Sequence, residues 1–208
     1  PEQEHSFKHA LTREVAYRSL LLKRRVEIHE SIGRAIESLH TESLEEHYEL
    51  LAYHYARSNN QEKAVEYLGL ANQKAARASA MEQAKAYFDK AMDLLGTLPE
   101  SEENRERRTA LLVNQSIVFE LLLQWTDYYE LLTRYKSHAK RVRDPLLLAA
   151  YYNRMAGCEW SFGLFDEAIH TSSKAIDLGE TAGNREHVAY AFTVLTCSYL
   201  WKGDLIRA

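Results

Sequence analysis

The sequence predicts an all-α fold, an α-solenoid in which antiparallel helix pairs stack on one another. A short segment at 163–168, Gly-Leu-Phe-Asp-Glu-Ala, recurs in outline at 203–208, and an aromatic-rich helical stretch precedes each copy. Apolar residues follow helical spacing along most of the chain, and strand-like alternation is confined to residues 5–7. The 208 residues include three prolines and eight glycines, which favours long helices with short connections. A fixed repeat period indicates stacked units that present a surface.

The first elements are two helices, expected at residues 9–22 and 24–39. In the second, the buried face is predicted from an apolar stripe at helical spacing, formed by Ile28, Ile32, Ala35, Ile36 and Leu39. The run from Ser43 to Glu46 has the pattern of a capping box, in which a hydroxyl and a carboxylate satisfy free backbone donors. A helix should follow this box to about Arg57, and the polar run at 58–60 predicts a tight break.

The remaining elements are helices with clear start or stop signals. Two are expected at 61–78 and 81–96, and the second should end where Gly96 is followed by Pro99. Further on, Asp144 as N-cap with Pro145 in the first turn predicts a helix start. After an acidic loop at 100–103, the helices are expected at 104–122, 125–141, 146–161, 164–180 and 185–201.

Small side chains mark the places where two helices can approach closely. Ala168, Ser172 and Ala175 share one helical face, because they are separated by four and three residues. Larger apolar side chains flank this face, and the partner helix supplies bulk to fill the gap: Phe165, Ile169 and Ile176 on one helix, and Tyr152, Met155, Ala156 and Trp160 on the other. The pattern predicts that these two helices nest against each other.

This arrangement of bulky and small residues resembles the tetratricopeptide repeat. The resemblance is specific for 149–182, fair for 189–208 and looser for 109–142, where Tyr128 and Tyr135 replace small residues and predict a more splayed hairpin. Two overlapping frames, 45–78 and 65–96, also match, and the sequence leaves the choice between them open. The resemblance implies a right-handed superhelix whose concave face holds a partner.

The beginning of the chain has a second pattern, which runs from Phe7 through His9 to Tyr17 and continues to His29. It resembles the junction after the ATPase core in bacterial signalling ATPases of the STAND class, some of which are fused to class III adenylate or guanylate cyclases. The resemblance implies that 1–40 is the remnant of a winged-helix domain with its linker helices. Residues 41–208 would then be a repeat array, truncated at its C-terminus, within an excised piece of a larger protein. His9 matches a histidine that senses the bound nucleotide in such proteins, and its alternative role is packing or capping at a helix start.

Composition and motifs argue against several other functions. The formal net charge of −4 gives no bulk attraction to nucleic acid, and no apolar run approaches the ~20 residues of a membrane span. Neither a phosphate-binding Gly-x-x-x-x-Gly-Lys-Ser/Thr loop nor a nucleophile with a partnered base is visible. His47 and His54 are about two helical turns apart, too far for one metal ion. We therefore expect no enzyme activity, cofactor or metal in these residues.

Charged and sulfur-containing residues are expected to play ordinary structural roles. The basic clusters at 23–25 and 140–143 should lie at helix ends or turns as solvated surface, where cations complement a helix C-terminus. Arginines 105, 107 and 108 should pair with the acidic loop that precedes them. Cys158 and Cys197 are predicted to be buried free thiols, which fits a cytoplasmic protein.

The candidate binding groove comes from the repeat register. Two first helices should present groove-facing residues, namely Asn153, Gly157 and Trp160 on one, and Tyr190, Thr193, Cys197 and Trp201 on the next. Such an aromatic strip could hold a peptide or a small ligand, or its rings could instead pack between repeats as core. Trp125 is expected to fill the turn between its two helices.

The function predicted first is a non-catalytic interaction and regulatory arm of a larger signalling ATPase. Its partners would be a protein or peptide in the concave groove and the adjacent ATPase domain. A second hypothesis is a small-effector-sensing repeat domain of a transcription activator, with a deep aromatic pocket near Trp160 and Trp201. A third is self-association into a homodimer through the exposed C-terminal repeat face.

Overall fold

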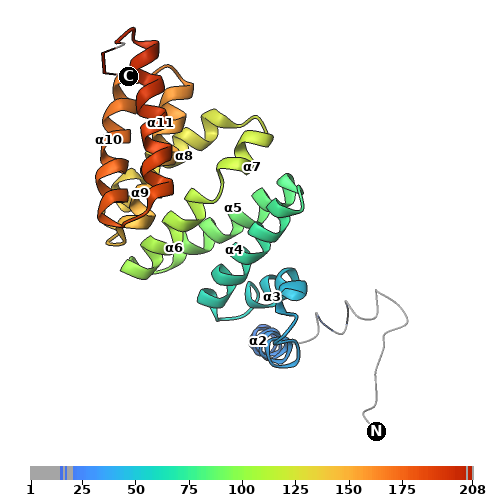
Figure 1. Ribbon diagram of the computed structural model, residues 1–208. Helices are drawn as coiled ribbons and strands as arrows, with labels where there is room; N and C mark the ends of the chain where they lie inside the picture. Colours follow the sequence, from blue (N-terminus) through green and yellow to red (C-terminus); the bar gives the residue numbers. More distant parts are fainter. Residues whose placement is uncertain (1–14, 16, 18–20, 205, 208) are drawn as a thin grey trace. The chain divides into compact units, whose positions relative to one another are not determined.

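The computed structural model describes Val15, Tyr17, residues 21–204 and residues 206–207 (Figure 1). Helices and short connections make up this part of the chain, with no strand in it, so the predicted all-α fold is confirmed. The elements are α2 (Leu22–Leu39), η1 (Leu44–His47, a 3₁₀ turn), α3 (Tyr48–Tyr55), α4 (Gln61–Arg77), α5 (Met81–Thr97), α6 (Glu102–Val113), α7 (Ser116–Leu121), α8 (Trp125–Ala139), α9 (Pro145–Ser161), α10 (Phe165–Thr181) and α11 (Arg185–Trp201).

The chain forms two compact units, one ending at Lys74 and the other beginning at Ala75, within α4. In the first unit, α2 packs against α3. In the second, successive helices pack as neighbours: α5 against α6 and α7, α8 against α9, and α9, α10 and α11 against one another. Packing between adjacent helices is the arrangement of an α-solenoid. The predicted division at residue 40, the strand at 5–7 and the junction motif with His9 stay predictions, and the strand, Phe7 and His9 lie outside the described residues.

Most predicted helices agree with the structure to within two residues at each end, because their signals are local. Asp144 Oδ1 accepts a hydrogen bond of 2.9 Å from the amide of Leu146, and Pro145 begins α9. The repeated glycines, Gly163 and Gly203, have φ of +74° and +77°, a conformation that glycine adopts without strain. They follow α9 and α11, which explains why the motif recurs.

The predicted packing face in the second unit is also confirmed. Ala168, Ser172 and Ala175 are fully buried. Ala168 forms a core cluster with Ala156 of α9 and Val194 of α11, which Trp160 partly covers. Three helices therefore meet where the side chains are smallest.

The predicted buried face of α2 is only partly right, because Ile36 is buried as predicted but Ile32 and Leu39 are not. Leu39 is 77% exposed and Ile32 is 36% exposed, whereas the buried residues are His29, Gly33 and Ile36. Gly33 explains the difference, since a Cβ there would lie 2.8 Å from Cζ of Tyr55 in α3. The bare backbone of Gly33 admits this ring, so the helix turns that face toward α3.

The basic cluster at 23–25 also differs from its prediction. It lies in the first turn of α2, at the N-terminus of a helix and not at a C-terminus, and Arg24 pairs with Glu27 at 3.2 Å. The second cluster does follow the C-terminal end of α8, as expected, and Arg143 pairs with Glu102 at 3.3 Å.

The predicted capping box at Ser43 does not form. Ser43 has φ −127° and ψ 29°, and its side chain makes no capping bond. Its amide donates to His40 O and its carbonyl accepts from the amide of Glu46, both at 3.0 Å. These short-range bonds lead the chain into the 3₁₀ turn η1, and α3 begins only at Tyr48.

Two other predicted helix ends are shifted. The helix expected to reach Arg57 ends at Tyr55. Gly96 lies inside α5, which continues to Thr97, and Leu98 is extended with ψ 152°. The reason is Pro99, because a residue before proline is pushed out of the helical conformation.

The single helix predicted at 104–122 is broken into α6 and α7 at Asn114 and Gln115. The break frees backbone carbonyls that an unbroken helix would satisfy. Tyr128 of α8 donates its hydroxyl to Leu112 O at 2.9 Å, and Nε of Arg154 donates to Val113 O at 3.4 Å. Side chains from two later helices thus accommodate the break, and a sequence window of local residues cannot reveal it.

Candidate functional site

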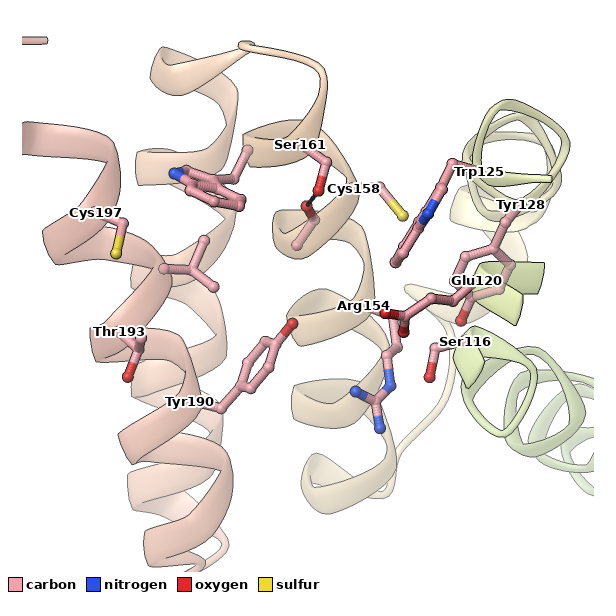
Figure 2. Close-up of a pocket in the computed structure, with 13 residues that line it drawn as sticks. Ser116, Glu120, Trp125, Tyr128, Arg154, Cys158, Ser161, Tyr190, Thr193 and Cys197 are labelled. Atoms are coloured by element: carbon pink, nitrogen blue, oxygen red, sulfur yellow. Dashed lines mark hydrogen bonds between the residues drawn. The ribbon is translucent and has the colours of Figure 1, made fainter. Parts of the chain in front are cut away.

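A cavity of about 460 Å³ lies in the second unit, between α7, α8, α9 and α11. We call it the recess. Figure 2 shows that labelled side chains from these helices converge on it. The lining residues are Ser116 and Glu120 from α7, Trp125 and Tyr128 from α8, Arg154, Gly157, Cys158, Trp160 and Ser161 from α9, and Tyr190, Thr193, Val194 and Cys197 from α11.

One wall of the recess is formed by Tyr190, which reaches from α11 toward α9 (Figure 2). Gly157 permits this contact, since a Cβ at that position would lie 2.7 Å from the Tyr190 hydroxyl oxygen. The Tyr190 side chain stays 40% exposed. Because Gly157 has no side chain, Tyr190 can lie close to α9, and this distance determines the width of the recess.

Arg154 brings a positive charge into the recess. Its Nε donates to Val113 O, and its guanidinium carbon lies 5.9 Å from the centre of the Tyr190 ring. Within the described residues, no carboxylate forms an ion pair with Arg154. Its side chain is thus fixed in position by a carbonyl and an aromatic face.

The arginines of α6 behave differently from Arg154. As predicted, they pair with the acidic residues that precede them: Arg105 with Glu100 at 3.5 Å, Arg107 with Glu103 at 2.6 Å, and Arg108 with Glu100 at 3.6 Å. Arg154, in contrast, lines the recess and forms no ion pair with a described residue.

The titratable groups of the recess favour binding over chemistry. Burial raises the pKa of the Cys158 thiol to about 12, so it stays protonated and is no nucleophile at neutral pH. Burial also raises the pKa of the Tyr128 and Tyr190 hydroxyls, which therefore stay neutral. Glu120 is an exposed carboxylate of α7 and has no ion pair with Arg154. Together these groups offer hydrogen bonds, aromatic surface and one fixed cation.

Five of the seven predicted groove residues line the recess: Gly157, Trp160, Tyr190, Thr193 and Cys197. Asn153 does not, because it is buried and its Nδ2 donates to the backbone oxygen of His187 at 3.0 Å, which joins α9 to α11. Trp201 is 70% exposed and stacks on Phe165 at a centroid distance of 6.4 Å. That any of them binds a partner stays a prediction, as does self-association through the C-terminal face.

Sequence reasoning missed the contributions of α7 and α8 to the recess, and it missed Arg154. Trp125 lines the cavity as well as beginning α8 after its turn. Arg154 could have been found, since it lies three residues before Gly157 and seven before Ser161, on the same helical face. Cys158 and Cys197 are free thiols, the first buried as predicted and the second half-buried.

The histidines pair in a way that the sequence did not indicate. In the first unit, Nδ1 of His29 lies 3.0 Å from Nδ1 of His54, and Nε2 of His29 lies 2.9 Å from the Tyr17 hydroxyl. The ring of His47 packs on the ring of His40, with 3.9 Å between the ring centroids, and does not face His54. No group of three or more histidine, cysteine or acidic residues within metal-binding reach occurs among the residues that the structure describes.

None of the helices in the described part of the chain combines the length and the apolar character needed to cross a bilayer.

Comparison with known proteins gives a likeness of fold. No family model matches the chain, and no curated protein matches it. Among solved structures it is similar to the crystal structure of BtubC (BKLC) from P. vanneervenii, with a TM-score of 0.61 and 15% sequence identity. The match covers 91% of this chain and 87% of BtubC. At this identity the likeness supports the helical fold alone.

Proposed function

We propose that the unit from Ala75 onward is a non-catalytic binding module that takes a protein or peptide segment into the recess. The observation that carries the proposal is the cation of Arg154, which forms no ion pair with a described residue and lines a cavity walled by aromatic rings. Ligand pockets combine mostly apolar walls with a few convergent polar groups. The recess has this composition, and its groups lack an activated nucleophile.

We further propose that the module is a regulatory arm of a larger cytoplasmic signalling ATPase. This part rests on the sequence resemblance of the pattern that begins at Phe7. A partner held in the recess would favour whichever arrangement of the arm binds it more tightly, and would shift an on–off equilibrium by that difference in affinity. The free thiols are compatible with a reducing compartment.

A second candidate function is the sensing of a small effector. The observation that favours it is the volume of the recess, about 460 Å³, within the range of roughly 300–1,000 Å³ that is usual for small-molecule pockets. In this case the occupant would be a metabolite, and it would shift the on–off equilibrium by the same difference in affinity.

The test is a peptide selection with a blocked variant of the recess. Thr193 is an exposed lining residue of α11, so Thr193→Trp should fill the recess without disturbing the core. Its neighbour Phe192 is 48% exposed and does not line the recess, which makes Phe192→Trp the matched control. A displayed library of random dodecapeptides is selected on the wild-type chain, and the affinity of each enriched peptide is measured on all three proteins.

We expect enriched peptides to bind the wild type and Phe192→Trp equally and to lose about tenfold or more in affinity on Thr193→Trp, because a filled cavity cannot accept an anchor side chain. Equal binding to all three proteins, or a library without enrichment, would refute peptide capture in the recess.

A further inference from the structure

The structure assigns a ligand chemistry to the recess: we infer that it binds a carboxylate attached to an aromatic or other apolar group, with Arg154 as the carboxylate's partner. This inference rests on the proposed function and names the kind of group that the module takes. The carboxylate could belong to a small organic acid or to the C-terminus of a peptide.

Two contacts fix the orientation of Arg154 in the recess. Its Nε is already used by Val113 O at 3.4 Å, and the Tyr190 ring lies 5.9 Å from its guanidinium carbon. The terminal nitrogens carry the remaining N–H donors, and a planar guanidinium can bind a carboxylate through two parallel hydrogen bonds. Because the side chain is already anchored, less conformational entropy is lost on binding than for a freely moving arginine.

A second feature of the recess is the charge of Arg154. The arginines of α6 pair with carboxylates, whereas Arg154 has no ion pair within the described chain. Glu120 lines the same recess but does not form one. A carboxylate from outside can therefore bind the guanidinium without displacing a described carboxylate.

A third feature of the recess is its aromatic lining, which suits the apolar part of the ligand. Aromatic rings from three different helices border the cavity, those of Trp125 and Tyr128, Trp160, and Tyr190. Such rings favour an aromatic or aliphatic body packed beside the charged group. Hydroxyls of Ser116, Ser161 and Thr193 also line the recess, although the Ser161 hydroxyl already donates to Gly157 O at 2.8 Å.

The experiment compares matched acids and amides. The probes are 3-phenylpropionate with its neutral partner 3-phenylpropionamide, and the peptide acetyl-Ala-Ala-Phe with a free C-terminal carboxylate or a C-terminal amide. Binding is followed by calorimetry and by tryptophan fluorescence, since Trp125 and Trp160 line the recess. We expect each acid to bind at least about tenfold more tightly than its amide, as is typical of a hydrogen bond to a charged group.

Three variants identify the residue responsible. Arg154→Gln keeps an N–H that can donate to Val113 O, and it should abolish the preference for acids. Arg154→Lys keeps the charge but loses the planar fork, and it should retain a part of that preference. Glu120→Gln removes a negative charge from the recess and should tighten binding of both acids about two- to fivefold at low salt. Circular dichroism of each variant checks that its helices are intact.

The outcomes separate this inference from the proposed function. If the free acid binds and the peptide acid does not, the source is a small molecule, and the reverse result points to a peptide C-terminus. If neither acid binds the wild type more tightly than its amide does, or if Arg154→Gln still prefers acids to amides, the inference is overturned. Loss of peptide binding in Thr193→Trp would still support capture in the recess in that case.

Discussion

The two units of this chain treat their charged side chains in different ways. In the first unit, the Glu37 carboxylate accepts hydrogen bonds from the hydroxyls of Tyr55 at 2.6 Å and Tyr67 at 2.5 Å. Lys63 adds an ion pair with the same carboxylate at 3.1 Å. Side chains from α2, α3 and α4 therefore meet at one charge. Desolvation by itself would raise the pKa of Glu37, but the hydrogen bonds from both tyrosines and Lys63, with the lysine's charge, together lower it.

In the second unit, buried hydroxyls bond to backbone carbonyls instead. Tyr128 donates to Leu112 O and Tyr151 donates to Leu132 O. Glu159 is 98% buried, and its Oε2 has no hydrogen-bond partner. Burial raises the pKa of this carboxyl group, with hydrogen bonding to Thr171 as a smaller opposing effect.

The difference shows what each unit uses its polar groups for. In the first unit, side chains from three helices share the Glu37 carboxylate. In the second unit, small residues such as Ala168 let α9, α10 and α11 pack closely. Arg154 of the second unit forms no ion pair with a described residue, so its charge can be presented to a ligand.

The largest effect is expected from Glu37→Leu. Removing the carboxylate leaves the buried hydroxyls of Tyr55 and Tyr67 without an acceptor. Hydrogen bonds to a charged group are worth about 1.5–3 kcal/mol, so the first unit should lose about 2–4 kcal/mol of unfolding free energy. Urea unfolding gives the size of the loss, and hydrogen exchange shows whether it is confined to residues 22–74.

The matched control for that change is Glu66→Leu. Glu66 also pairs with Lys63, at 3.2 Å, but its side chain is 48% exposed. An exposed pair contributes about 0–1 kcal/mol, so this variant should be nearly neutral. Equal losses in both variants would show that the tyrosine bonds to Glu37 contribute little.

The next effect has the opposite sign and lies in the second unit. Glu159→Gln removes a buried charge, and it should raise the stability of this unit by about 1–2 kcal/mol at pH 8, since desolvation of a charged carboxylate is costly. The folded pKa is above its usual value, so Glu159 favours the folded state at acid pH and opposes it as the pH rises. The gain should therefore shrink toward pH 5.

Thermal unfolding at both pH values measures this gain, with the exposed Glu167→Gln as control. If Glu159→Gln destabilises the chain at pH 8, the carboxylate has a role in cohesion, and the contrast between the units fails.

Much of this fold could be predicted from the sequence because its signals are local. Asp144 and Pro145 start α9 whatever lies around them, and helical spacing placed Ala168, Ser172 and Ala175 on one buried face. Capping and periodicity depend on residues within one or two turns of each other. For the same reason five groove residues were found along α9 and α11.

The errors occur where distant residues decide the outcome. The break at Asn114 needs Tyr128 and Arg154, which come from other helices. The buried face of α2 depends on the fit of Tyr55 against Gly33. Trp201 follows the groove register in sequence, yet Phe165 gives its ring a different partner. Contacts between residues far apart in the sequence leave no pattern in the residues next to either partner.

The smallest effect concerns the His29–His54 pair, which should make the stability of the first unit depend on pH. Burial lowers the pKa of both His29 and His54, and the charge of Arg57 lowers both further. For His54 the neighbouring His29 has the same effect. The folded pair is therefore neutral, and one ring nitrogen can donate to the other. The unfolded chain binds protons as the pH falls below about 6.5, so this contribution to stability is present above that pH and is lost below it.

Between pH 7.5 and 5.5 the first unit should lose about 0.5–1 kcal/mol, the worth of one hydrogen bond. Urea unfolding followed by histidine NMR signals measures this loss, and His54→Phe should reduce it, because a phenyl ring can neither donate nor take up a proton. Exposed His170 in the second unit supplies the control, since His170→Asn should leave the pH dependence of the first unit unchanged. If the first unit were equally stable at both pH values, the short contact between the two imidazoles would not stabilise α2 against α3, and polar cohesion there would rest on Glu37 alone.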